Sequence, residues 1–418
     1  MEITALGAAR EVGRSAFLVK GKETQVLLDF GVLMSRNPLF PAHVQPRDVD
    51  GIVLSHAHLD HSGGIPLFYL SEGVDVYATA VTLELSRLLI NDFLKISGFY
   101  LPFEYLELLS MVKRSKAMEM NEEVRIGEFT ARLRDAGHIP GSSITVLEGD
   151  RKRLLYTGDV NGRDTYLLNG ATLDSEEFDV VITESTYATS DHPPREEAEK
   201  ALVEFATEIV ENGGTLLVPA FSVGRAQEIA CVLRAHSFPY PVAMDGMALE
   251  VNEILFRHQE YLKDPTQFRR SIENLELISG WGKRRALAGN PGVIIAPAGM
   301  LVGGSAVFYN QEISTKAKNG IAIVAFQVPG TPGRTLLEKG LAMVRGRPTK
   351  VKATVRRFDF SSHSGRTELF TMLRSVKGSP KVLTVHGEEA SCVRFAEDIK
   401  AELGFDAEAP GPGQSYSV

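Results

Sequence analysis

The chain has 418 residues, of which 44% are hydrophobic and 23% are charged, and its formal net charge is −8. These values are typical of a soluble globular protein with two or three domains and a large core. Only two cysteines occur, which argues against a disulfide-based scaffold and makes the cytoplasm the expected location. No apolar run of ~18 residues and no apolar leader before the first expected strand are present, so neither membrane spanning nor secretion is expected.

The first part of the chain combines short strand-like runs with two helical patterns. Strand-like runs fill residues 1–55, helices are expected near residues 81–95 and 102–112, and strands then continue to residue 184. A different unit begins near residue 190. There, Pro193 and Pro194 precede a helix whose apolar residues recur at helical spacing, and Gly213 with Gly214 ends it.

From residue 215 onward, strands and helices alternate. Strands are expected at residues 215–218, 293–296 and 321–326, and helices at residues 224–235 and 249–261. This alternation predicts a parallel sheet with helices on its faces. After residue 360 come a helix at 366–375, a strand that ends at His386 and a helix at 390–403. Residues 409–414 are too rich in proline and glycine to predict regular structure there.

The segment His56-Ala-His-Leu-Asp-His61 holds three of the ten histidines of the chain. The apolar residues 51–54 lead into it as a strand, so its polar side chains are expected on a loop at the carboxyl end of that strand. Imidazole and carboxylate groups together suit Zn²⁺ or a similar divalent ion. In a turn, His56 and His58 can converge on one ion while Asp60 and His61 point to a second.

A site for two ions needs more ligands, and three candidates stand at the ends of other apolar runs. Each alone is more often a structural hydrogen-bonding group, but together they complete a dinuclear set. In that set His56, His58 and His138 bind one ion, Asp60, His61 and His386 bind the other, and Asp159 bridges them. Asp29 ends another strand and is either a carboxylate that orients a ligating histidine or a turn residue before Gly31.

The order and spacing of Asp29, the His-Ala-His-Leu-Asp-His segment, His138 and Asp159 resemble those of the metallo-β-lactamase superfamily. Further segments resemble the β-CASP nucleases within it. These are Val181-Ile-Thr-Glu184-Ser-Thr-Tyr187, residues 218–228, residues 296–304, Phe360-Ser-Ser-His363-Ser-Gly365 and Val385-His386-Gly-Glu388. The opening residues 6–13 are more similar to the nuclease subunit of the eukaryotic mRNA 3′-end cleavage complex, and to its prokaryotic relatives, than to RNase J.

The resemblance implies a fold and a division of roles. The expected fold is an α/β protein, in which a metallo-β-lactamase αββα sandwich, residues 1–188 and 359–418, is interrupted by an inserted β-CASP domain, residues 189–358. Two Zn²⁺ ions would activate a water near neutral pH for attack on phosphorus, with Asp60 and Asp159 acting at the metals. His363, held by Glu184, would protonate the leaving oxygen.

Several polar side chains are candidates for contact with an RNA phosphate. Ser222 and Arg225 stand at a strand-to-helix junction, where N–H groups favour anions, although Arg225 is equally explained by a surface ion pair. The hydroxyl-bearing candidates are Ser361, Ser362 and Ser364. Trp281 is suited either to stacking on a base or to filling the core, and the core is slightly favoured.

Lysine and arginine are concentrated between Arg334 and Arg366, and Lys283-Arg284-Arg285 forms another cluster. Because the whole chain is acidic, a nucleic-acid groove needs such a local concentration of positive charge. The basic run is therefore expected to line a groove for single-stranded RNA between the two domains. The alternative is that these residues are ordinary solvated charges.

The predicted function is zinc-dependent hydrolysis of single-stranded RNA, with endonucleolytic cleavage first and a 5′→3′ exoribonuclease of RNase J type second. A non-catalytic RNA-binding subunit is disfavoured because every predicted ligand is present. A small-molecule hydrolase is disfavoured because it needs no inserted α/β domain. No membrane partner is expected, and a second copy of the chain or an RNA-processing complex remain open as partners.

Overall fold

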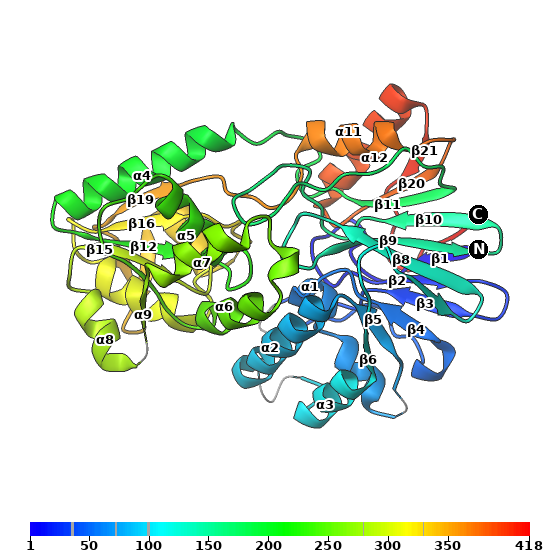
Figure 1. The fold of residues 1–418 in the computed structure, drawn as a ribbon, viewed down its shortest axis with the longest axis horizontal. Helices are drawn as coiled ribbons and strands as arrows, with labels where there is room; N and C mark the ends of the chain where they lie inside the picture. Colours follow the sequence, from blue (N-terminus) through cyan, green and yellow to red (C-terminus); the bar gives the residue numbers. More distant parts are fainter. Residues whose placement is uncertain (35–36, 72, 98–100, 279, 329) are drawn as a thin grey trace. The chain divides into compact units, whose positions relative to one another are not determined.

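The computed structural model describes residues 1–418 except residues 35–36, 72, 98–100, 279 and 329. The chain forms two compact units (Figure 1). Unit 1 comprises Met1–Asp164, Gly170–Asp191 and Ser362–Val418, and unit 2 comprises Thr165–Asn169 and His192–Ser361. Unit 2 is therefore an insertion, because the chain leaves unit 1 and later returns to it.

Unit 1 is built on two seven-stranded sheets. The first has the order β22-β1-β2-β3-β4-β5-β6, and its strands are β1 (Glu2–Ala5), β2 (Phe17–Lys20), β3 (Gln25–Leu28), β4 (Gly51–Val53), β5 (Val76–Ala78), β6 (Ser115–Ala117) and β22 (Ser415–Ser417). The second has the order β21-β20-β11-β10-β9-β8-β7, and its strands are β7 (Glu123–Ile126), β8 (Phe129–Asp135), β9 (Ser143–Gly149), β10 (Lys152–Tyr156), β11 (Val180–Glu184), β20 (Lys381–Val385) and β21 (Asp406–Glu408).

These sheets form the middle layers of a four-layer sandwich. Phe17 and Leu28 of the first sheet share one buried cluster with Phe129, Leu154 and Ile182 of the second. The outer face of the first sheet packs against α2 (Ala80–Ser97) and α3 (Tyr105–Arg114). The outer face of the second packs against α11 (Arg366–Ser375) and α12 (Glu389–Leu403). The predicted αββα arrangement is confirmed.

The two ends of the chain lie side by side in unit 1 (Figure 1). Residues 409–414 form no strand or helix, as their composition predicts, but β22 follows them and pairs antiparallel with β1, with Tyr416 opposite Ile3. This strand was not predicted, because three residues are too few to show an alternating pattern.

Unit 2 contains a six-stranded sheet in which every pair of neighbouring strands is parallel. Its order is β14 (Glu276–Leu277), β13 (Val242–Met244), β15 (Gly292–Ala296), β12 (Thr215–Pro219), β16 (Gly320–Ile323) and β19 (Thr354–Arg357). The helices are α4 (Arg195–Glu211), α5 (Arg225–Ala235), α6 (Ala248–Arg257), α7 (Pro265–Glu273), α8 (Trp281–Leu287), α9 (Gly304–Ile313) and α10 (Pro332–Lys339). Figure 1 shows α4 on one face of the sheet and α9 on the other.

Some elements differ from their prediction. Helix α3 begins at Tyr105 rather than at residue 102, because the Glu104 N–H donates to the Glu107 carboxylate at 2.8 Å and caps the helix there. The hairpin of β17 (Leu341–Val344) and β18 (Arg347–Lys350) was not predicted and forms a separate sheet. Trp281, for which a core position was preferred, is 58% exposed. Among the described residues, no helix has the length and apolarity needed to cross a membrane.

Candidate metal centre

The predicted ligands gather because several strands of unit 1 end at the same edge. In the second sheet, β10, β11 and β20 are parallel, and β8 runs in the same direction because β9 lies antiparallel to both β8 and β10. His138, Asp159 and His386 follow β8, β10 and β20. In the first sheet, β3 and β4 are parallel, and His56 follows β4. The loop after β4 continues into the short helix α1 (Leu59–Ser62), which carries Asp60 and His61.

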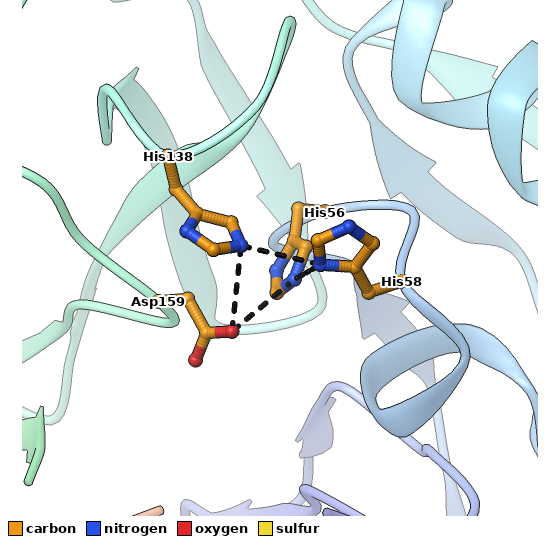
Figure 2. Close-up of side chains that lie close together, drawn as sticks. All are labelled: His56, His58, His138 and Asp159. Carbon is orange, nitrogen blue, oxygen red and sulfur yellow. Dashed lines mark hydrogen bonds and ion pairs between the residues drawn. The ribbon is translucent and has the colours of Figure 1, made fainter. Parts of the chain in front are cut away.

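The first group of side chains consists of His56, His58, His138 and Asp159 (Figure 2). The His58 Nδ1 lies 3.2 Å from the Nε2 of His56 and 3.2 Å from the Nε2 of His138. The Asp159 Oδ2 lies 3.5 and 3.6 Å from the same two Nε2 atoms. Two atoms bonded at ~2.0–2.1 Å to one tetrahedral Zn²⁺ lie ~3.3 Å apart, so these separations fit a shared ion.

The second group consists of Asp60, His61, Asp159 and His386. The His386 Nε2 lies 3.3 Å from the Asp60 Oδ2, and the His61 Nε2 lies 3.3 Å from the Asp159 Oδ1. Asp159 therefore offers Oδ2 to the first group and Oδ1 to the second. A carboxylate placed in this way is suited to bridging two cations.

The protonation states of the first group, which includes the shared Asp159, suit a metal. Burial lowers the pKa of His56 and His138 well below the usual histidine range, and it lowers the pKa of His58 to about 4. These rings are therefore neutral near pH 7, which is the form that binds metals. Burial opposes ionisation of Asp159, but the surrounding histidines, His386 foremost, hold its pKa well below the usual range.

Asp29 lies directly behind His61. Its Oδ2 accepts hydrogen bonds from His61 Nδ1 at 2.6 Å, from the Ser55 hydroxyl at 2.7 Å and from the Tyr156 hydroxyl at 2.6 Å. Asp29 is fully buried, and its φ of 57° is in the left-handed region. Because Nδ1 of His61 is engaged with Asp29, Nε2 faces the metal position. His138 is oriented in the same way, since its Nδ1 donates to the Ser362 carbonyl at 2.7 Å.

Close packing against the backbone of α1 explains why residue 31 is a glycine. A Cβ at this position would lie 1.8 Å from the carbonyl oxygen of Asp60. The neighbouring Phe30 N–H donates to the His61 carbonyl, and the Ser15 N–H donates to the Asp60 carbonyl. The segments before β2 and after β3 therefore fix the backbone of α1, and with it the directions of Asp60 and His61.

His363 lies beside the two groups but bonds to a carboxylate outside them. Its Nδ1 is 2.9 Å from Glu184 Oε2, and the Glu184 Oε1 also accepts from the Val160 N–H at 2.8 Å. Burial favours the neutral ring, but the charges of Glu184, Asp159 and Asp60, with the hydrogen bond to Glu184, together outweigh it and raise the pKa of His363 to about 9. The ring is therefore protonated near pH 7, which suits an acid rather than a metal ligand.

The predicted phosphate contacts occupy different kinds of positions. Ser222 and Arg225 are each 7% exposed within unit 2, and Arg225 donates to the Val324 carbonyl at 2.7 Å, so Arg225 is buried rather than on the surface. Ser364 is 2% exposed, and its hydroxyl accepts from the Gly162 N–H at 2.9 Å. This burial disfavours direct phosphate contact by these three side chains. Ser361 and Ser362 are half-buried.

Ser55 and Tyr156 were not predicted as members of the site. Ser55 contacts Asp29 through both its N–H and its hydroxyl. Tyr156 is 2% exposed and packs on Phe17 with the ring centroids 5.4 Å apart. Only their positions in the sequence could have indicated this role. Ser55 directly precedes His56, and Tyr156, which carries a hydroxyl, ends the strand before Asp159.

Comparison with known proteins divides the chain into three matched regions. Residues 9–207 match the metallo-beta-lactamase superfamily, residues 226–336 match the Beta-Casp domain, and residues 348–410 match the Zn-dependent metallo-hydrolase RNA specificity domain.

Curated relatives match over nearly the whole chain. "RNase aCSPSF2" of Saccharolobus solfataricus is 40% identical over 99% of this chain and 84% of its own length. "Probable RNase MJ4" of Methanocaldococcus jannaschii is 34% identical over 100% of both chains. A crystal structure of a protein of unknown function from Enterococcus faecalis aligns with a TM-score of 0.65 over 99% of both chains, and at 14% identity it supports the fold alone. The chain therefore belongs to the metallo-β-lactamase superfamily, in the group of hydrolytic nucleases that join this fold to a β-CASP domain.

Proposed function

We propose that this chain is a zinc-dependent ribonuclease that hydrolyses phosphodiester bonds of single-stranded RNA. The observation that carries the proposal is the convergence of two ligand groups on Asp159, with His363 and Glu184 beside them. The RNase names of the relatives support RNA as the substrate.

Zinc is proposed because the first group offers three imidazole nitrogens and one carboxylate oxygen, a set that zinc sites use. His56, His58 and His138 would hold one ion, Asp60, His61 and His386 the other, and Asp159 both. When bound, two such ions supply hydroxide near neutral pH and stabilise charge on the phosphate. Asp29 fixes the direction of His61, and the Ser362 carbonyl fixes that of His138.

His363 is the proposed general acid. Its Nδ1 is engaged with Glu184, which leaves Nε2 to give a proton to the leaving oxygen of the RNA. The side chain is 20% exposed, whereas that of Glu184 is fully buried, so the ring is open to a substrate while its partner is not. Glu184 thus keeps the ring charged and oriented.

Contact with the RNA backbone is proposed for the hairpin of β17 and β18. Arg345 and Arg347 flank its tip, both are exposed, and neither forms an ion pair within the described part of the chain. These arginines would displace cations condensed on the RNA phosphates, which makes binding dependent on salt.

Endonucleolytic cleavage is proposed first, because the opening residues resemble the 3′-end-processing branch. We also propose a cytoplasmic location, which the two buried and unbridged cysteines support. RNA labelled along its whole length, carrying either a 5′-monophosphate or a 5′-triphosphate, distinguishes the modes of cleavage. Internal fragments from both substrates would support the endonuclease, whereas mononucleotides released only from the monophosphate would identify a 5′→3′ exonuclease. No cleavage of either RNA would overturn the proposed function.

A further inference from the structure

Trp281, the only tryptophan of the chain, begins helix α8 on the surface of unit 2. It is 58% exposed, so the core does not account for it. Its ring meets the ring of Phe308 edge-on, with centroids 5.4 Å apart at 85°. The guanidinium carbon of Arg284 lies over it at 5.0 Å from the ring centroid. Two neighbours therefore hold the ring while much of it faces solvent.

Arg284 is itself fixed from beneath. Its Nε and Nη2 donate to the two carboxylate oxygens of Asp245 at 2.6 and 2.9 Å. Asp245 is fully buried and also accepts from the Tyr309 hydroxyl at 2.8 Å. A forked ion pair of this kind restricts the arginine to one geometry. The ring of Trp281 is therefore held in place before a ligand binds. Stacking of a flat ligand on it then costs little side-chain conformational entropy.

The charge beside the ring is positive. Arg284 is neutralised by Asp245, but Arg285 is exposed and makes no ion pair among the residues that the structure describes. Arg285 lies four positions after Trp281 and therefore on the same side of the helix. Lys283 is also exposed, but a spacing of two directs it to the other side.

We propose that Trp281 and Arg285, here termed the α8 surface, bind single-stranded nucleic acid. A base would stack on Trp281, and the adjoining phosphate would contact Arg285. The chemistry fits an unpaired strand, because every base has a π-face and each linkage has one negative charge, whereas a duplex keeps its bases stacked inside. A protein partner is disfavoured by the unpaired charges, since the cores of protein interfaces are depleted in charged residues. The inference rests on the proposed function, to which it adds an RNA contact in unit 2.

The single tryptophan makes the test direct, because tryptophan emission reports on Trp281 alone. Oligouridylate, which has little structure of its own, is titrated into the full zinc-loaded chain carrying His363→Ala, so that cleavage is slow. Emission is expected to fall with the same midpoint as the anisotropy of labelled RNA. RNA binding detected by anisotropy without a change in tryptophan emission would overturn the proposal that the α8 surface binds nucleic acid.

Substitutions give a second readout. Trp281→Ala is expected to weaken RNA binding roughly 5- to 100-fold, and Trp281→Phe, which keeps a ring, to restore most of it. Arg285→Gln should weaken binding more than Lys283→Gln, which removes an equal charge from the other side of the helix. Tyr105→Ala removes another exposed ring, 47% exposed in unit 1, and should have no effect. Unchanged affinity in Trp281→Ala would contradict the proposal, and loss of self-association in that variant instead would assign the surface to a second copy of the chain.

Failure of this inference is distinguishable from failure of the proposed function. Trp281→Ala should hydrolyse bis-p-nitrophenyl phosphate at the native rate, because this small diester needs no stacked base. A native chain that cleaves RNA without any change in emission on binding would overturn the α8 surface alone. A native chain that neither binds nor cleaves RNA would overturn both.

Discussion

His363 and Glu184 are 179 positions apart in the chain, yet the imidazole Nδ1 lies 2.9 Å from the carboxylate Oε2. The pair spans the insertion, because Glu184 ends β11 before unit 2 begins and His363 follows it. The two segments are also joined by the bridge between Tyr187 and Gly365 and by the bond from the Arg366 N–H to the Ser190 carbonyl. The entry and exit of the insertion are thus held together beside the candidate acid.

Replacement of His363 separates acid catalysis from metal binding. His363→Ala should slow RNA cleavage by ~10²–10⁴-fold, the usual contribution of a general acid, while zinc content and RNA affinity remain native. His386→Ala is the matched control, because it removes a histidine of the second ligand group and should lower the zinc content. Equal loss of zinc in the two variants, or an active His363→Ala chain, would contradict this division of roles.

The pH dependence of cleavage should reveal the same acid. The pKa of His363 is about 9, so the protonated fraction falls as the pH rises through that value, and the rate should fall with it. Two bound cations would repel the charged ring, which puts the alkaline limb of the profile at or below pH ~9.

Glu184→Gln tests the cause of that raised pKa. The amide oxygen can still accept from the Val160 N–H, but the negative charge is gone, so the alkaline limb should move to lower pH. Rate profiles of both chains measured over the same pH range provide the comparison. Coincident alkaline limbs would mean that His363 is not the group that titrates.

Asp29 is expected to support the metals through His61. Asp29→Asn should weaken zinc binding ~10- to 100-fold, a typical cost of losing a carboxylate behind a ligating histidine. Tyr156→Phe removes one of the donors to Asp29 and should act in the same direction but less strongly. Competition with a chromogenic chelator measures both effects.

Tyr309→Phe is the matched control, since it removes a similar tyrosine–aspartate bond in unit 2. Zinc affinity should be native in this variant. If Asp29→Asn bound zinc as tightly as Tyr309→Phe, Asp29 would have only a structural role.

The β17–β18 hairpin provides a test of electrostatic RNA binding. Arg345→Glu combined with Arg347→Glu should weaken binding of single-stranded RNA and flatten its salt dependence, because fewer counterions are released. Lys113→Glu with Lys116→Glu reverses two exposed charges in unit 1 and serves as the control. Hydrolysis of bis-p-nitrophenyl phosphate should be unchanged in both chains. RNA affinity that falls equally in the two double variants would reflect net charge rather than the hairpin.

The sequence predicted the parts of the site that combine a chemical pattern with a strand end. Asp159 and His386 follow strands with apolar runs, and His138 follows β8, in which apolar and polar residues alternate. Strands that run in the same direction bring such ends to one edge, where the structure places all three beside the His56–His61 segment. Tyr156 was missed because it ends an apolar run, and its ring packs in the core. Its hydroxyl acquires a role only through Asp29, which is 127 positions away.

Exposure was the property that sequence predicted least well. Arg225 is a charged residue at a helix start, yet the packing of α5 buries it, whereas the solitary Trp281 is exposed. Side-chain type gives an average preference for burial, but the neighbours of a side chain decide the individual case. The hairpin β17–β18 was missed because its strands have only four residues each and show no apolar alternation, since β17 is apolar throughout and β18 holds two charges and a proline.

Titration of the metal-free chain with Zn²⁺, with cleavage of single-stranded RNA as the readout, tests the central claim most directly. The ligand groups share Asp159, so the account predicts no cleavage without metal and a rate that rises until two ions are bound per chain. Full activity at one ion per chain, or cleavage by the metal-free chain, would contradict the proposal that the chain is a ribonuclease with two zinc ions.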